Sequence, residues 1–181
     1  MTTRIEEGRL AFEFSDNWRV FKLDDHRDYR EKIEKVDGTK AVDILGIFNE
    51  TDLYLIEIKD FRGYRIESKD RLKDGVLAIE IAKKVRDSLA CIVSAHRTSS
   101  DREYWRPFAR HLCNPDRGVK VVIWLENDPD PPNLQLRRKA RAAISSDVFS
   151  QKLSWLTGRV LVCGSDEAHL PDVTIYNLPH D

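Results

Sequence analysis

The stretch "VDILGIFNETDLYLIEIKDFRG", Val42 to Gly63, contains two apolar runs separated by a short polar one. The apolar runs predict two β-strands, at about Ala41–Phe48 and Leu53–Phe61. The residues between them, "NETD", are mostly turn formers or strand avoiders. The stretch therefore predicts an antiparallel hairpin.

Four charges lie close to the ends of these two strands. Asp43 follows the start of the first strand, and Glu57, Lys59 and Asp60 come near the end of the second. A charge inside a sheet is unfavourable unless it is paired or binds an ion. Because the runs are otherwise apolar on both faces, which is typical of a sheet covered on both sides, the charges are candidates for a functional site.

The length of the hairpin loop determines whether these charges meet. Side chains alternate along a strand, so Glu57 and Lys59 share one face and Asp60 points to the other, where it can end the strand or pair with Arg62. A loop of three or five residues puts Asp43 opposite Glu57. A loop of four residues would put the two acids on opposite faces.

Two opposed carboxylates are unfavourable at close range unless a positive charge lies near them. Directly opposed side chains have Cβ atoms about 4.5–5.5 Å apart, and bare carboxylates at that distance repel each other. A divalent cation between Asp43 and Glu57 removes the repulsion, and oxygen ligands favour Mg²⁺ or Mn²⁺. The alternative is a solvated salt bridge between Lys59 and one of the acids.

The rest of the chain predicts strands alternating with helices. Further strands are expected at Arg9–Phe14, Trp18–Leu23, Ala90–Ala95, Val119–Asn127 and Arg159–Ser165. Helices are expected at about Asp25–Val36, Ser68–Leu89, Asp101–Cys113 and within Leu134–Thr157. The predicted buried side of the second helix consists of Leu72, Val76, Ile79, Ala82 and Leu89. This order indicates an α/β fold with a central mixed β-sheet flanked by helices.

Length and composition restrict the class of protein. The 181 residues suit a single domain over 1–181, and a net charge of −1 is less basic than that of a typical sequence-blind DNA coater. Three widely spaced cysteines predict neither disulfides nor a zinc ribbon. The chain also lacks an apolar signal core and an apolar run of membrane length. Together with the cysteines, these features favour a cytoplasmic protein without a membrane partner. The chain has no P-loop and no G-x-G-x-x-G motif, which argues against a nucleotide-powered activity.

Asp43, a turn and then Glu57-Ile58-Lys59 at the end of the next strand resemble the motif of the PD-(D/E)XK nuclease superfamily, whose fold is restriction-endonuclease-like. The resemblance covers about residues 25–95 and extends to the expected order of a helix, the hairpin and a helix–strand pair. Val42 stands where the family's name has proline. The expected core then spans about 25–126, with 1–24 and 127–181 as elaborations.

The resemblance implies a metal-dependent nuclease, with DNA favoured over RNA. Asp43, Glu57 and the main-chain carbonyl of Ile58 would bind Mg²⁺ or Mn²⁺. Lys59 would hold or activate the attacking water, or stabilise the charge that develops on the phosphoryl group. The implied partner is nucleic acid, and a homodimer is compatible with cutting both strands. The alternative is a catalytically silent nucleic-acid-binding or assembly module of the same fold.

Other charged residues are candidates for supporting roles. Some family members have another acid on the helix before the hairpin, for which we select Glu31, with Glu34 and Asp28 as the alternatives. Glu80 and Lys83 lie on the helix after it, and no feature selects either. The candidate nucleic-acid contacts are Arg62, Arg65, Arg137 and Arg138. Ordinary solvated charges are the alternative for each of these residues.

Overall fold

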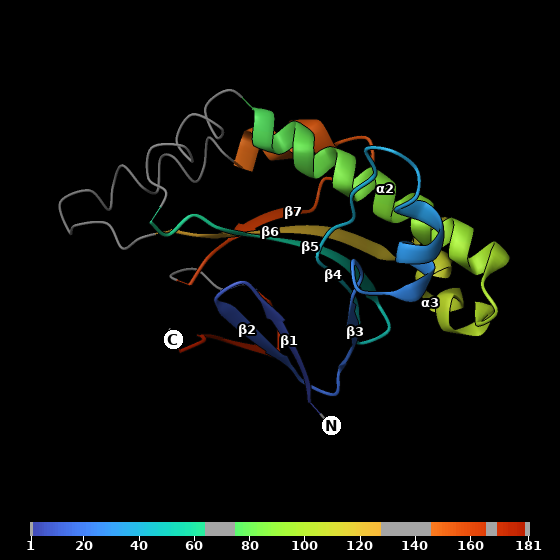
Figure 1. Ribbon diagram of the computed structural model, residues 1–181, viewed down its shortest axis with the longest axis horizontal. Helices are drawn as coiled ribbons and strands as arrows, with labels where there is room; N and C mark the ends of the chain where they lie inside the picture. The colour runs from blue at the N-terminus through green and yellow to red at the C-terminus, as the bar shows by residue number, and fades with distance from the viewer. Residues whose placement is uncertain (1, 64–74, 128–145, 166–169, 180–181) are drawn as a thin grey trace.

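A five-stranded mixed sheet lies at the centre of the protein. The computed structural model describes residues 2–63, 75–127, 146–165 and 170–179. In sheet order the strands are β3 (Trp18–Lys22), β4 (Ile44–Phe48), β5 (Asp52–Asp60), β6 (Gly118–Glu126) and β7 (Val160–Cys163). The first three pair antiparallel, and β5, β6 and β7 pair parallel. The expected α/β architecture with a mixed sheet is confirmed (Figure 1).

Helices cover one face of this sheet and a second, smaller sheet covers the other (Figure 1). The helical layer contains α2 (Val76–Thr98), α3 (Arg102–Cys113) and a helical segment at 146–153. The smaller sheet is antiparallel, in the order β1 (Thr3–Glu7), β2 (Leu10–Phe14), β8 (Val173–Asn177). The apolar strands of the central sheet are therefore buried on both faces, as their composition predicted.

The hairpin of β4 and β5 has the register that brings its acids together. Three residues, Asn49, Glu50 and Thr51, join the strands, and the first two have positive φ angles of 48° and 56°. Leu45 pairs with Leu55 and Ile44 with Ile56. The loop thus has one of the odd lengths on which the pairing of the two acids depended, and the same register carried one residue further puts Asp43 opposite Glu57.

The predicted strand at Ala90–Ala95 is wrong, because these residues continue α2. This helix runs for 23 residues through Thr98 and is followed by α3, which keeps Pro107 inside it. A six-residue apolar run does not by itself distinguish a strand from a buried helical segment. No helix breaker precedes Ala90, and Cys91, Ile92 and Ala95 all continue the buried stripe. The strand that pairs parallel with β5 is therefore β6.

The predicted buried side of α2 is wrong at Val76 and Ile79, whereas Ala82 and Leu89 are partly buried and pack against the core. The helix buries the stripe Leu77, Ile81, Val85, Ser88, Ile92 and Ala95 against the sheet. Val76 and Ile79, which were expected inside, are 50% and 42% exposed. The predicted and the observed stripes are both apolar at the N-terminal end of the helix. The observed stripe, which is buried, continues through the whole helix. The predicted start at Ser68 lies outside the described residues.

The helix expected at about Asp25–Val36 is much shorter in the structure. Its helical part consists of residues 27–28 followed by η1, a π-helical turn at Tyr29–Ile33. Tyr29 is its buried residue, while Val36 is 61% exposed, so the segment has no continuous apolar face to support a longer helix.

The predicted strands at Arg9–Phe14 and Trp18–Leu23 are confirmed as β2 and β3. Those at Val119–Asn127 and Arg159–Ser165 are confirmed as β6 and β7. The central sheet thus includes β3 and β7, which come from segments expected to be elaborations. No helix in the described residues combines the length and the apolar character needed to cross a bilayer.

Candidate active site

Asp43 and Glu57 lie on the helix-covered face of the sheet. Their residues are 7% and 0% exposed, respectively. The main-chain carbonyl of Asp43 accepts a hydrogen bond from the Leu23 N–H at 2.9 Å, which ties Asp43 to the end of β3. Its Oδ2 accepts a second bond from the Ile58 N–H at 2.6 Å. One carboxylate oxygen of Asp43 is thus fixed by β5, and the other, Oδ1, accepts a hydrogen bond from Lys84 Nζ at 3.5 Å.

Two lysines contact this acid pair from different elements. Lys59 Nζ lies 2.8 Å from Glu57 Oε1, on the face that strand alternation predicted. Lys84 Nζ, from α2, lies 2.6 Å from the same oxygen and 3.5 Å from Asp43 Oδ1. Both carboxylate oxygens of Glu57 are buried and accept no hydrogen bond in the described part of the chain. The contacts of both ammonium groups with Glu57 Oε1 are therefore ion pairs.

Glu80, also from α2, completes the surroundings of Lys59. Its Oε1 lies 3.5 Å from Lys59 Nζ. Of Glu80 and Lys83, the two candidates on α2, Glu80 lies at the site. Lys83 is exposed, and its neighbour Lys84 takes the contact with the acids.

Burial changes the protonation of the site. Burial is the largest cause that raises the pKa of Glu57, to about 7, and repulsion from Asp43 adds to it. Burial also raises the pKa of Asp43, against the effect of Lys84 and the Ile58 N–H. Burial alone would lower the pKa of Lys84, but Glu57 and Asp43 raise it above its ordinary value. The lysine stays charged, while Glu57 is only partly ionised near neutral pH.

The stability of the metal-free protein is expected to fall as pH rises from about 5 to about 7. Unfolded Glu57 loses its proton above its ordinary pKa of 4.5, whereas folded Glu57 holds the proton up to about 7. Between these values the folded state binds more protons, so each rise in pH favours unfolding, by a total of up to about 3 kcal/mol. Urea unfolding in EDTA between pH 5 and 8 measures this slope. Glu57→Gln should flatten it, and an unchanged profile would contradict the assignment.

Two acids that were not predicted gather at Asp43 from the other side. Carboxylate oxygens of Glu7, Asp24 and Asp43 all lie within 4.8 Å of one another. Glu7 also binds Lys22 Nζ at 2.8 Å, and Asp24 Oδ1 is buried without a hydrogen-bond partner in the described residues. Glu7 ends β1, a strand that the sequence did not predict, so no local pattern could have placed it here.

The acids expected on the helix before the hairpin are not part of this group. Glu31 and Glu34 are exposed. Asp28 is buried, but its Oδ2 accepts hydrogen bonds from Ser99 Oγ at 2.8 Å and Trp105 Nε1 at 2.9 Å. Asp28 therefore anchors the start of α3, and Glu7 and Asp24 are the acids that lie beside Asp43.

Asp60 is the last residue of β5 and also pairs with Arg62, so both roles considered for it are present. Arg62 Nη2 lies 2.7 Å from Asp60 Oδ2, and Arg9 Nε reaches the same oxygen at 2.8 Å. Arg62 also bonds Asn177 in β8. The guanidinium is thus engaged in joining the hairpin to the smaller sheet. The other candidate nucleic-acid contacts, Arg65, Arg137 and Arg138, lie outside the described residues.

Comparisons with known proteins show a distant sequence similarity between this chain and a curated enzyme. No protein-family model matches the chain, and no solved structure matches it. A curated cysteine–tRNA ligase of Neisseria meningitidis serogroup A / serotype 4A (strain DSM 15465 / Z2491) is 27% identical over 212 residues. The match covers 98% of this chain and 29% of the ligase, so the chain spans less than a third of that protein's length.

Proposed function

We propose that this protein is a metal-dependent nuclease that hydrolyses phosphodiester bonds of nucleic acid, with DNA preferred over RNA. The observation that carries the proposal is the buried acid pair on adjacent strands, Asp43 and Glu57, with Lys59 Nζ 2.8 Å from Glu57 on the same face. Two carboxylates and a lysine in this order on a β-hairpin are what the resemblance to the PD-(D/E)XK nucleases leads one to expect.

The residues present fit a divalent cation. Among the described groups that are not exposed, four carboxylates (Glu7, Asp24, Asp43, Glu57) lie near three ammonium groups (Lys22, Lys59, Lys84). Glu57 Oε2 and Asp24 Oδ1 are buried without a hydrogen-bond partner in the described residues. An all-oxygen donor set favours Mg²⁺ or Mn²⁺.

The proposed ligands are Asp43 and Glu57, with the carbonyl of Ile58. The N–H of Ile58 faces Asp43, and the N–H and C=O of one strand residue point to the same side, so this carbonyl faces the same edge. A bound Mg²⁺ or Mn²⁺ would polarise a phosphoryl oxygen and lower the pKa of a water molecule.

In the proposed reaction Lys59 acts at the phosphate group that is cleaved. Its ammonium lies beside Glu57, where it can orient the attacking water and stabilise the negative charge that develops on the phosphoryl oxygens. Glu80 contacts the same ammonium at 3.5 Å and limits its movement. Glu80 is thus a positioning residue in this account.

Cleavage of labelled single- and double-stranded DNA and RNA, with Mn²⁺, Mg²⁺ or EDTA, tests the proposal. Transfer RNA belongs among the substrates because the curated relative is a tRNA ligase by name. We expect metal-dependent cutting by the wild type and a loss of about 10²–10³-fold in rate for Lys59→Ala. Equal cutting by both proteins would contradict the assignment. Binding of nucleic acid without cutting would favour the catalytically silent module.

A further inference from the structure

An open groove runs along the outer side of α2, next to the helical segment at 146–153. It has a volume of about 310 Å³ and is lined by Ile79, Ala82, Lys83, Arg86, Lys152 and Trp155. Two of its apolar side chains are unusually accessible for their size, since Trp155 is 54% and Ile79 42% exposed. The groove thus presents a large aromatic ring to solvent.

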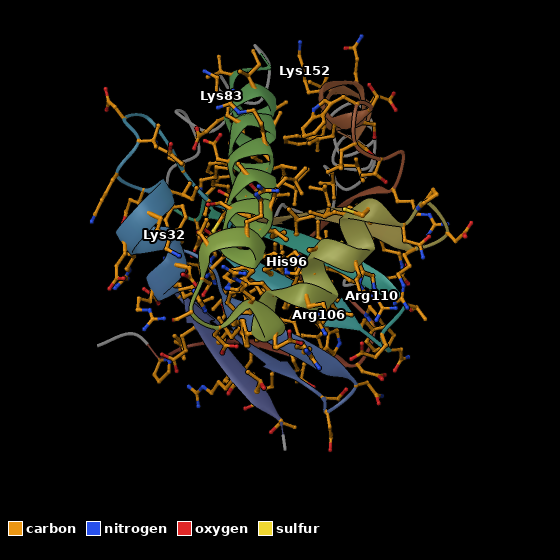
Figure 2. The ribbon with its side chains drawn as sticks, turned by 90° about the vertical axis from the view of Figure 1, so that its right-hand side faces the viewer. Lys32, Lys83, His96, Arg106, Arg110 and Lys152 are labelled. Atoms are coloured by element: carbon orange, nitrogen blue, oxygen red, sulfur yellow. The ribbon has the colours of Figure 1, made fainter. Side chains whose placement is uncertain are left out.

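The groove is positively charged as well as apolar. In the part of the chain that the structure describes, Lys83 and Lys152 take part in no ion pair. Arg86 pairs with Asp87 at 2.8 Å, yet its side chain remains 64% exposed. Figure 2 shows Lys83 on α2 and Lys152 on the neighbouring helical segment at the same end of the molecule. Two ammonium groups without an acidic partner among the described residues therefore flank the exposed indole.

The groove continues toward the candidate active site. A second depression, of about 350 Å³, shares Ile79 and Lys83 with the first and extends to Glu80. Glu80 in turn lies 3.5 Å from Lys59 Nζ. Lys83 and Lys84 are consecutive in α2, and they contact the groove and the acid pair, respectively. An extended chain lying in the groove would therefore lead to the proposed catalytic residues.

We infer that this groove binds a single-stranded segment of nucleic acid, with a base stacked on Trp155 and phosphates held by Lys83 and Lys152. An aromatic platform beside cations is the combination that single strands require, because an unpaired base has a free face and the backbone carries the charge. A paired duplex would not offer that face. This inference specifies the substrate class of the proposed nuclease. It rests on the proposed function in one respect, namely that the groove leads to the catalytic residues.

Fluorescence anisotropy with a labelled single-stranded oligonucleotide, in EDTA to prevent cutting, tests the inference. Trp155→Ala is expected to weaken binding by about 5- to 100-fold, and Trp155→Phe by less than about 3-fold, because a phenyl ring still stacks. The wild type should bind the single strand at least about 10-fold more tightly than a blunt duplex.

The salt dependence of binding tests the two lysines separately. Each lost phosphate contact to a single strand lowers the slope of log K against log salt concentration by about 0.7, so Lys83→Ala/Lys152→Ala should lower it by about 1.4. The matched control is Arg106→Ala/Arg110→Ala, which removes the same charge from α3, away from the groove (Figure 2). The control should leave the slope unchanged.

The outcomes separate this inference from the proposed nuclease activity. Binding that depends on Trp155 without any cutting would support the groove and count against the nuclease. If the protein cuts nucleic acid but Trp155→Ala binds the single strand as tightly as the wild type, the inference about the groove is overturned and the proposed nuclease activity is not. Absence of oligonucleotide binding, as expected if the groove holds another protein, would also overturn it.

Discussion

The Glu57→Gln variant is expected to lose at least about 100-fold of its Mn²⁺-dependent cleavage rate, because even groups that only orient a metal ligand contribute about 10–100-fold in affinity or activity. Glutamine has the same shape but supplies no anionic oxygen. Lys84 keeps Asp43 and Lys59 keeps Glu80 as partners, so the variant should fold. Calorimetric titration of Mn²⁺ should show weaker binding in parallel with the lost activity.

Asp52→Asn is the matched control for this variant. Asp52 starts the same strand, β5, and its carboxylate pairs with Lys120 Nζ at 3.1 Å, at the end of the strand remote from Glu57. The Asp52→Asn substitution removes one carboxylate from the same strand and should leave both the cleavage rate and the Mn²⁺ affinity unchanged. A Glu57→Gln protein that still cuts at the wild-type rate would place the chemistry elsewhere.

The Lys84→Met variant is expected to be about 3–5 kcal/mol less stable than the wild type at pH 8 in EDTA, since removing one partner of a buried ion pair leaves an uncompensated charge. Lys84 contacts both acids, and methionine leaves Asp43 and Glu57 facing each other with Lys59 on one of them. The loss should be smaller at pH 5.5, because Glu57, whose pKa is about 7, then takes up a proton.

Mn²⁺ should restore much of the stability that Lys84→Met loses. A divalent cation bound by the two acids replaces the missing ammonium, and in the variant it has no lysine to displace. Urea unfolding at pH 8, with EDTA or with Mn²⁺, measures the difference. Lys83→Met is the control: its side chain is exposed, and the change should stay within about 0.5 kcal/mol. Equal destabilisation of Lys84→Met with and without Mn²⁺ would mean that no cation binds between the acids.

Strand alternation, together with an odd-length hairpin loop, accounts for the arrangement of Asp43, Glu57 and Lys59. Side chains along a strand repeat every two residues, so once the loop has an odd length the partners follow without any knowledge of the rest of the fold. The same rule correctly put Asp60 on the opposite face, where Arg9 and Arg62 bind it. Local geometry therefore determined the central part of the site.

The contributions of α2 and β1 could not be obtained in this way. The N-terminal end of α2 has two apolar stripes, and only packing against the sheet selects the one with Leu77 and Ile81, which turns Lys84 toward the acids. Glu7 reaches Asp43 because the smaller sheet packs on the central one, a contact between segments with no shared sequence pattern. The stripe that packing leaves outside, with Val76 and Ile79, borders the grooves of α2.

Anomalous diffraction from a crystal grown with Mn²⁺ tests the central claim most directly. We expect one Mn²⁺ peak within bonding distance of Asp43 Oδ1 and a Glu57 oxygen, with the ammonium of Lys84 moved away from its 2.6 Å contact with Glu57. A crystal in which Lys84 keeps both of its contacts and no Mn²⁺ lies between the acids would contradict the account. The buried charges would then be an ion-pair network that serves the fold alone.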